Sequence, residues 1–204
     1  MCYHLKNFNG EMFMWTLEED IAEYTRDIEK NPNDDDAYAG RAVTYEELEQ
    51  YDLAIRDYGS VIEINPNDNW AYCGRGYCYC ELKQYKLAIQ DFNKAIEIKS
   101  NYSWYYSGRG NAYYKLQQYE KALQDFNKAI ELEPNHSWYY VYRGKAYNGL
   151  KQYKLAIEDF NKAIEIYSYN EDAYYNRGIS YYELEDKENS QEDFTKAKEL
   201  GYEG

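Results

Sequence analysis

Residues 109–134 read RGNAYYKLQQYEKALQDFNKAIELEP, and the stretches on either side repeat this pattern. RGYCYCELKQYKLAIQDFNKAIEIKS precedes it at residues 75–100, and RGKAYNGLKQYKLAIEDFNKAIEIYS follows at residues 143–168. Each copy is displaced from the last by 34 residues. A fixed period of this length is typical of a stacked array, in which each repeat is one supersecondary unit and the core grows with repeat number.

The pattern extends over most of the chain as five full repeats, at residues 35–68, 69–102, 103–136, 137–170 and 171–204. Each repeat predicts two amphipathic helices with a short break between them, at Gln117–Gln118 in the third repeat. Helices of about 14 residues are marginal alone in water. The two must therefore bury their apolar stripes on each other and on the next pair. The repeats open at Asp35, Asn69, Ser103, Ser137 and Glu171, and we expect the first four side chains to cap the first helices.

Residues 1–34 are predicted to hold an N-terminal cap and an incomplete repeat. Thr16 followed by Glu19 indicates a capping box that starts a helix running to about Lys30. Residues 1–16 show no clean period, and Gly10 interrupts any helix there. We expect this segment to fold back over the first helix of the array, because a terminal repeat otherwise exposes one face. The alternative is that it lies in the groove of its own or a neighbouring chain.

Small residues recur at two positions of the repeat. One register holds glycine in the first helix of four repeats, and the other holds alanine in the second helix. Glycine inside a helix costs about 0.5–1 kcal/mol relative to alanine, so its recurrence predicts close contact with a bulky neighbour. A third register supplies the ring for that contact. The three registers are Gly76, Gly110, Gly144 and Gly178; Ala54, Ala88, Ala122 and Ala156; and Tyr58, Phe92, Phe126, Phe160 and Phe194.

This pattern resembles the tetratricopeptide repeat, a 34-residue pair of helices with small and aromatic residues at set positions and a closing proline, here Pro134. The resemblance covers residues 35–204, with a half match at residues 17–34. It implies an all-α fold, a right-handed superhelical solenoid of antiparallel helix pairs whose first helices line a concave groove. It also implies a protein that binds a peptide or partner protein there and has no catalysis of its own.

The chain departs from the family pattern at several positions. Arginine precedes the small residue of the first helix in all five repeats, as in Arg109, and aspartate follows sixteen residues later, as in Asp125. We interpret this as a repeated structural ion pair, because a partly buried arginine needs a partner; a ladder of arginines that binds acidic ligands is the weaker alternative. The turn between the helices lacks the usual glycine. The fifth repeat has a polar second helix, with Ser190, Gln191 and Lys198, which is expected of a final cap that ends near Gly201.

Composition narrows the function classes. The net charge of −14 disfavours nucleic acid and anionic membranes, whose recognition needs clustered Lys and Arg. The acidity serves either solubility or the attraction of a basic partner. Four cysteines, three of them in one predicted helix, do not form a disulfide framework, so a reducing compartment is the simpler context. The first residues match neither a signal peptide nor a membrane span. We therefore predict a cytoplasmic protein.

The groove face of each first helix is predicted from spacing, as the second, fifth, ninth and twelfth residues of each repeat. In the first repeat these are Asp36, Ala39, Val43 and Glu46. Tryptophan recurs at the second position of the middle three repeats, and Trp and Tyr are common interface anchors. The alternative is that each tryptophan packs on its neighbour and is only structural. The predicted partner-binding residues are Trp70, Cys73, Tyr77, Trp104, Asn111, Tyr114, Trp138, Lys145, Tyr175 and Tyr182.

No constellation for catalysis or for a cofactor is found in the sequence. Cys73 and Cys80 lie two helical turns apart, about 10 Å, too far to share one zinc ion. His4 and His136 lie in irregular segments, where neither is an oriented base. We therefore predict a non-enzymatic adaptor or scaffold, without metal or cofactor, that binds a protein or peptide of basic and apolar character. The alternative is a self-assembling structural protein whose groove or array end is filled by another copy.

Overall fold

The computed structural model describes residues 3–8 and 11–202 and divides the chain into two compact units. Unit 1, residues 1–100, contains strands β1 (Tyr3–Phe8) and β2 (Glu11–Thr16) and helices α1 (Leu17–Lys30), α2 (Asp35–Glu47), α3 (Tyr51–Ile64), α4 (Asn69–Glu81) and α5 (Tyr85–Ile98). Unit 2, residues 101–204, contains helices α6 (Ser103–Lys115), α7 (Tyr119–Leu132), α8 (Ser137–Gly149), α9 (Tyr153–Ile166), α10 (Glu171–Glu183) and α11 (Lys187–Glu199).

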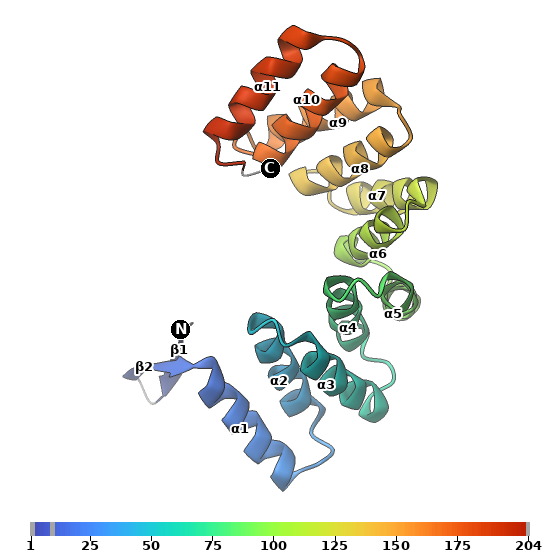
Figure 1. Cartoon of the computed structure of the whole chain (residues 1–204). Helices are drawn as coiled ribbons and strands as arrows, with labels where there is room; N and C mark the ends of the chain where they lie inside the picture. Colours follow the sequence, from blue (N-terminus) through green and yellow to red (C-terminus); the bar gives the residue numbers. More distant parts are fainter. Residues whose placement is uncertain (1–2, 9–10, 203–204) are drawn as a thin grey trace. The chain divides into compact units, whose positions relative to one another are not determined.

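Helices pair in the order of the chain, and each unit is a helical solenoid (Figure 1). The two helices of each repeat pack as an antiparallel pair, α2 with α3 and α4 with α5 in unit 1, and α6 with α7, α8 with α9 and α10 with α11 in unit 2. Within a unit, each second helix also packs on the first helix of the next repeat. Because every described element after Thr16 is a helix of this arrangement, the predicted fold class is confirmed.

A two-stranded antiparallel hairpin precedes α1, and the sequence analysis did not predict it. β1 pairs with β2 from Tyr3 opposite Thr16 to Phe8 opposite Glu11. The sequence does hold a signal for it, because the two residues between the strands are Asn9 and Gly10, the pair that most favours two-residue hairpin turns. The predicted position of this segment over the first helix or in a groove rests on residues 1–15, whose side chains lie outside the described part of the structure.

The glycine register contacts the aromatic register, as predicted. A Cβ placed on Gly110 would lie 2.7 Å from a ring carbon of Phe126, and one placed on Gly144 would lie 2.7 Å from Phe160. The alanines of the second helices, such as Ala122, have no exposed surface. In the four repeats that have this glycine, a ring of one helix therefore lies directly on the backbone of its partner, which sets the close approach of the pair.

Helix caps follow the prediction at α1 and depart from it in the repeats. The Thr16 hydroxyl accepts from the Glu19 amide at 3.2 Å, and the Glu19 carboxylate accepts from the Thr16 amide at 2.8 Å, so the capping box is confirmed. The predicted caps at Asp35, Asn69, Ser103 and Ser137 are wrong by one residue. The capping positions are the residues before them: Asp34 accepts from the Ala37 amide, whereas Tyr102 and His136 make no side-chain cap.

The turn between the two helices of each repeat places a residue other than glycine in the left-handed region. These residues occupy one register, with φ between 57° and 63°: Glu49, Lys83, Gln117, Lys151 and Glu185. In the third repeat the Gln118 amide donates to the Tyr113 carbonyl at 2.9 Å, which closes the end of α6. The turn therefore keeps the geometry that favours glycine without using glycine.

The second helix of the fifth repeat is polar where the sequence predicted it to be. Gln191 and Lys198 on α11 are exposed, whereas Ser190 is buried and takes the place of the core alanine. Gly201 has φ of 99° directly after α11, and the Tyr202 amide donates to the Ala197 carbonyl at 3.0 Å. Gly201 thus marks a left-handed helix terminus, as expected.

Candidate functional site

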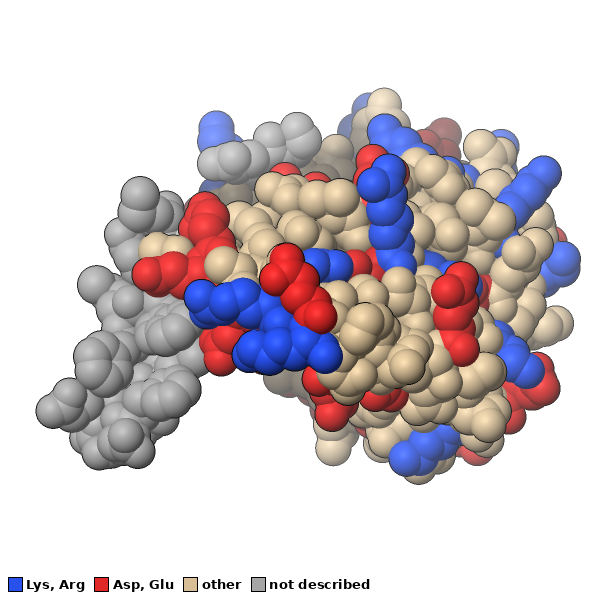
Figure 2. Space-filling view, turned by 90° about the horizontal axis from the view of Figure 1, so that it is seen from below, with Lys and Arg blue, Asp and Glu red and all other residues tan. Residues whose placement is uncertain are grey.

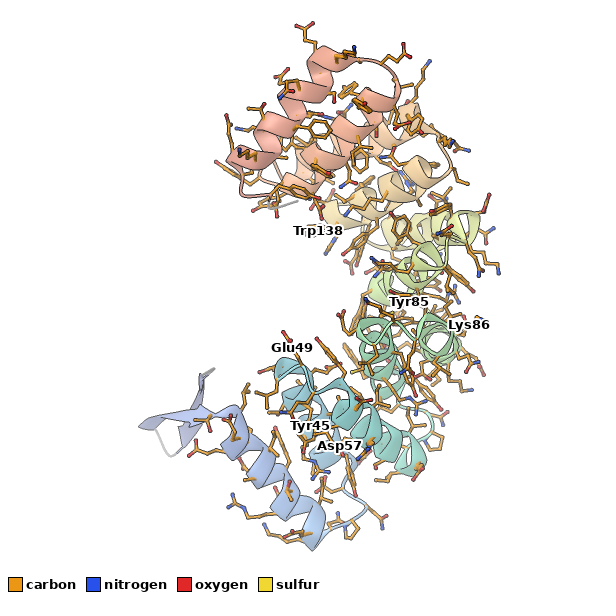
Figure 3. All side chains as sticks on the ribbon, viewed as in Figure 1. Tyr45, Glu49, Asp57, Tyr85, Lys86 and Trp138 are labelled. Carbon is orange, nitrogen blue, oxygen red and sulfur yellow. The ribbon has the colours of Figure 1, made fainter. Side chains whose placement is uncertain are left out.

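The predicted groove residues lie on the first helices, and we call the surface formed by the second, ninth, twelfth and thirteenth residues of each repeat the first-helix surface. Trp70 on α4 is 53% exposed and Tyr182 on α10 is 63% exposed. Trp138, which belongs to the first turn of α8, is half-buried (Figure 3). The other half-buried members of the predicted set are Tyr77, Trp104, Asn111, Tyr114, Lys145 and Tyr175.

The fifth position of the repeat is a packing position, which corrects part of the predicted set. Cys73 has 1% of its surface exposed, Ser107 has 7% and Val141 has none, so these side chains cannot contact a partner. Tyr175 holds the same position in the last repeat, and its ring stacks on Tyr202 at 4.1 Å. The spacing of residues along one helix predicted that this position faces away from the core. In the folded array, other parts of the chain cover it.

In unit 1 the first-helix surface combines exposed apolar side chains with acidic ones. Val43 on α2 is 46% exposed, and it holds the ninth position of its repeat, while Trp70 holds the second position of the next. Residues 17–68 contain 16 acidic and 4 basic residues, a net charge of −12, although the whole chain has −14. Figure 2 shows acidic and basic side chains interspersed on one face. On that face the acidic residues do not form one separate patch.

In unit 2, polar side chains connect the first helices of neighbouring repeats. Lys145 on α8 pairs with Asp172 on α10 at 3.2 Å, which shows that the ninth position of one repeat meets the second position of the next. The Ser180 hydroxyl donates to Asn148 at 2.8 Å, and the Asn148 amide donates to the Asn176 carbonyl at 3.3 Å. The sequence analysis placed Lys145 in the groove but did not find its partner Asp172.

A cavity of about 180 Å³ opens on the first-helix surface of unit 2. Its walls are three rings, an amide and two lysines, and three of these six residues belong to the predicted set. Burial raises the pKa of Tyr114 and Tyr142, so both hydroxyls stay protonated at neutral pH. The lining residues are Asn111, Tyr114, Lys115, Phe126, Tyr142 and Lys145.

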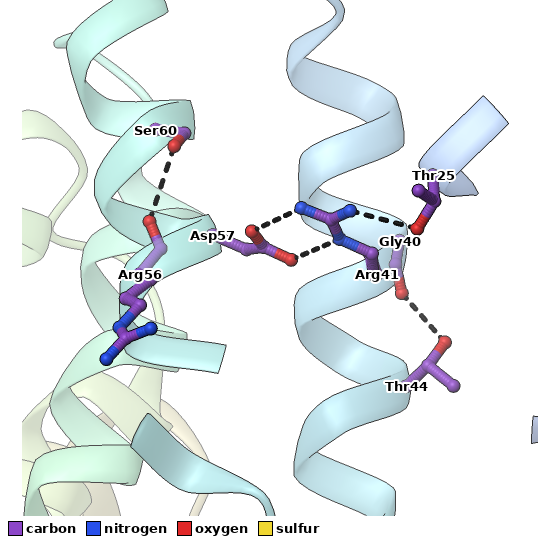
Figure 4. A network of polar contacts seen from close by, with 7 residues as sticks. All are labelled: Thr25, Gly40, Arg41, Thr44, Arg56, Asp57 and Ser60. Carbon is purple, nitrogen blue, oxygen red and sulfur yellow. Dashed lines mark hydrogen bonds and ion pairs between the residues drawn. The ribbon is translucent and has the colours of Figure 1, made fainter. Parts of the chain in front are cut away.

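The repeated arginines form the predicted ion pairs. Arg41 holds Asp57 with two parallel hydrogen bonds of 2.7 and 2.8 Å, and its third nitrogen donates to Thr25 at 3.0 Å (Figure 4). The rings of Tyr38 and Tyr45 flank the guanidinium at 5.7 and 5.9 Å. The aspartates are buried, and the same bidentate pair occurs in the other four repeats: Arg75–Asp91, Arg109–Asp125, Arg143–Asp159 and Arg177–Asp193.

These pairs occupy two nitrogens of every arginine of the ladder. Hydrogen bonding to Asp57 raises the pKa of Arg41. In the third repeat burial lowers the pKa of Arg109, but the hydrogen bond to Asp125 and the charge of Asp125, together with Tyr113 and Tyr106, raise it overall. Burial also raises the pKa of Asp125, even though Arg109 opposes this shift. The buried carboxylate is therefore costly in isolation and depends on its arginine.

A half-buried carboxylate joins the first two repeats inside unit 1. The Glu46 side chain accepts from the Tyr58 hydroxyl at 2.9 Å and from the Cys78 thiol at 3.0 Å. Burial raises the pKa of Glu46, and the two donors lower it without removing the shift. Glu46 was predicted as a groove residue, but its two partners turn it into a contact between α2, α3 and α4.

The cysteines of the described helices are not reactive, and the described residues hold no metal-binding group. Cys73 and Cys78 are buried free thiols, and burial raises the pKa of Cys80 to about 12, so none of these three is a reactive thiolate. Among the described residues, no three His, Cys, Asp or Glu side chains lie where they could share a metal ion. No helix in the described part of the chain has the length and apolar character needed to cross a membrane.

Comparison with known families identifies the repeat. Tetratricopeptide repeat families match residues 35–68, 70–102, 103–136, 126–158 and 171–200, and a TPR repeat family matches residues 144–185. The chain therefore belongs to the tetratricopeptide repeat family. No curated protein sequence matches it.

Solved structures of the same fold cover most of the chain. MamA from Desulfovibrio magneticus RS-1 is 21% identical, with a TM-score of 0.73, over 91% of this chain and 97% of that one. YrrB, a TPR protein with an unusual peptide-binding site, is 26% identical, with a TM-score of 0.71, over 87% and 92%. A tetratricopeptide repeat protein from Parabacteroides merdae ATCC 43184 is 26% identical, with a TM-score of 0.71, over 92% and 73%.

Proposed function

We propose that this protein is a non-enzymatic adaptor that binds a peptide segment of a partner protein on its first-helix surface. The observation that carries the proposal is the exposure of large apolar side chains at the predicted positions: Val43 at 46%, Trp70 at 53% and Tyr182 at 63%. A contiguous exposed apolar patch marks an interaction site. Val43 and Trp70 hold the ninth and second positions of successive repeats, the two positions that meet in unit 2 through Lys145 and Asp172. YrrB, a structural neighbour with a peptide-binding site, supports the same function.

The partner that this surface suits is a segment with basic and apolar side chains. The acidic excess of residues 17–68 attracts a cationic segment and speeds its encounter. The apolar pair Val43 and Trp70 then provides contact area for an apolar side chain. Weaker binding at high salt is the expected signature of such a partner.

We place this adaptor in the cytoplasm and assign it no cofactor. The free thiols Cys73, Cys78 and Cys80 suit a reducing compartment, because they occur on one helix and are not paired with each other. The buried thiols act as small apolar side chains in the packing.

The test uses fluorescence polarisation with a set of labelled peptides that combine Lys or Arg with Leu, Phe or Trp. For the tightest peptide, we expect Trp70→Ala, Trp104→Ala and Trp138→Ala each to weaken binding about tenfold, the effect of an interface anchor. Tyr167→Ala is the matched control, because Tyr167 is 50% exposed but lies outside the first helices. Circular dichroism confirms that each variant keeps its helices. Unchanged binding in all three tryptophan variants contradicts the proposal.

Self-assembly is the competing outcome. Light scattering over a concentration series measures it directly, and a mass that stays that of one chain of 24.4 kDa removes it. A mass that grows with concentration and returns to one chain on Trp70→Ala or Trp138→Ala would replace the adaptor with a self-assembling protein.

A further inference from the structure

The cavity of unit 2 gathers the cations of the first-helix surface. At the thirteenth position, Lys115 stands where Glu47, Glu81 and Glu183 stand in three other repeats. At the ninth position, Lys145 is the only cation among the five repeats. Both lysines line the same cavity of about 180 Å³, between α6 and α8. The acidic charge of the thirteenth position is therefore replaced by a positive charge beside this cavity, whereas a second cavity of unit 2 lies beside Glu183, where the charge stays negative.

The size and walls of the cavity suit one ring. An apolar protein cavity of about 150 Å³ holds one benzene molecule. Here the half-buried rings of Tyr114 and Tyr142 offer surface to a guest, whereas Phe126 is 1% exposed and supports Tyr142, on which it stacks at 5.8 Å. Ring-to-ring contacts of this kind favour an aromatic guest over an aliphatic one of equal area.

The two lysines determine which chemical group can lie beside a ring bound in the cavity. Lys115 is exposed at the cavity, so its ammonium is able to reach a group outside the cavity mouth. Lys145 gives Asp172 one contact at 3.2 Å, and an ammonium carries three donors. The Asn111 amide adds a polar group to the same lining. A carboxylate next to a buried ring can accept hydrogen bonds from these donors, whereas an ammonium at the same place would be repelled by the lysines.

We propose that this cavity is an anchor pocket for an aromatic side chain of the partner that is adjacent in sequence to an acidic residue. The inference deepens the proposed function and rests on it, because the pocket belongs to the first-helix surface. It assigns the pocket the opposite charge preference from the surface of unit 1.

The first test uses small probes, phenylacetate and phenethylammonium, titrated against the full chain and followed by 1H–15N NMR. Phenylacetate is expected to shift the amide signals of Asn111, Tyr114, Lys115 and Lys145, with a dissociation constant of about 1–10 mM, the range for a ligand of this size. Phenethylammonium should bind at least three times more weakly. Equal binding of the two probes, or no shift of these amides with phenylacetate, overturns the proposal.

The second test replaces the small probes with peptides and isolates the contribution of Lys115 to binding. Acetylated and amidated Ala-Phe-Glu-Ala and Ala-Phe-Lys-Ala carry no terminal charge, so only the side chains differ. The glutamate peptide should bind more tightly, and Lys115→Gln should reduce its affinity at least threefold. Lys128→Gln is the control, because Lys128 is an exposed lysine of the same unit that pairs with Glu131 at 2.8 Å. A loss equal in both variants, or none in Lys115→Gln, contradicts the proposal.

The two proposals fail in different ways. If Trp138→Ala abolishes binding of the partner peptide while Lys115→Gln and the glutamate probe have no effect, the pocket is wrong and the adaptor function stands. If the probes bind at Lys115 while all tryptophan variants keep the partner, the pocket exists and the first-helix surface is not the partner site.

Discussion

The ring of Phe126 lies so close to Gly110 that a Cβ at that glycine would be 2.7 Å from a ring carbon. We therefore expect Gly110→Ala to destabilise the protein by about 1–3 kcal/mol, the cost of inserting an atom into a packed core. The loss occurs although alanine favours a helix over glycine. Urea unfolding followed by circular dichroism measures the change in the free energy of unfolding.

The matched control is a glycine in open surroundings. Gly59 is inside helix α3, and the nearest atom to its added Cβ is the Arg75 guanidinium nitrogen at 3.8 Å. Gly59→Ala should stabilise the protein by about 0.5–1 kcal/mol, the helix preference of alanine. If the two substitutions changed stability in the same direction, contact with the ring would not be the reason for the recurring glycine.

A missing acceptor beside Arg75 gives the second prediction. The outer guanidinium nitrogen of Arg143 donates to Asn127 at 2.7 Å, and that of Arg177 donates to Asn161 at 2.6 Å. Sixteen residues before Arg75 stands Gly59, which has no side chain to accept. Gly59→Asn should therefore exceed the gain of Gly59→Ala by about 1 kcal/mol, because a hydrogen bond to a charged group is added.

The contribution of that hydrogen bond is isolated by the same substitutions made in an Arg75→Lys background. Lysine has a single side-chain nitrogen, so it cannot hold Asp91 with two bonds and also reach the introduced asparagine as the arginine fork does. The advantage of asparagine over alanine should therefore disappear. An advantage that persists with lysine would come from the helix itself and not from the arginine.

The third prediction concerns the buried pair Arg143 and Asp159. Asp159→Asn leaves the guanidinium largely buried without a counter-charge, and it should cost about 3–5 kcal/mol. The double variant Arg143→Met and Asp159→Leu removes both charges, and it should remain within about 1 kcal/mol of the parent. Urea unfolding of Arg143→Met, of Asp159→Leu and of the double variant gives the coupling energy.

This cycle also separates a structural pair from a ligand site. The double variant keeps the packing but has neither charge, so an adaptor that binds through its first-helix surface should retain its peptide affinity. Loss of peptide binding in the double variant, with its stability intact, would return the arginines to the role of ligand contacts.

The 34-residue period of the sequence predicted the contacts that recur from repeat to repeat, and it did not predict the element that occurs only once. The contact of Gly110 with Phe126 was predictable because the glycine recurs in four repeats, and the pair of Arg109 with Asp125 was predictable because both residues recur in all five. The hairpin of residues 3–16 occurs once, and no period marks it. Its only sequence signal was the pair Asn9 and Gly10.

The candidate site was predictable in outline and not in detail. Helical spacing placed Trp70 and Tyr182 at exposed positions, but it also selected Cys73, which is buried, because spacing within one helix ignores the neighbouring repeat. The cavity beside Lys115 depends on how α6, α7 and α8 pack together, so no single repeat contains its signal. The change from Glu to Lys at the thirteenth position was visible in the sequence, but only the structure shows that this lysine lies beside a cavity.

The fourth prediction uses the pH dependence of Glu46. Burial raises the pKa of Glu46 in the folded protein above its ordinary value, and the charge of Glu47 adds to the shift, while Tyr58 and Cys78 oppose it. The folded state therefore binds more protons at this site than the unfolded state does. By linkage, the contribution of Glu46 to the free energy of unfolding falls as pH rises through the folded pKa, and it recovers as pH decreases toward 4.5.

Glu46→Gln removes this titration while its side-chain oxygen still accepts from Tyr58. The variant should gain most relative to the parent at pH 7.5, and the gain should shrink steadily as pH falls to 5. Urea unfolding at pH 7.5, 6 and 5 measures the difference, and Glu63→Gln, at an exposed position of α3, is the control for general charge effects. A difference between variant and parent that stays constant across this range would show that the half-buried carboxylate does not titrate there, and that Glu46 serves only as an acceptor for its two donors.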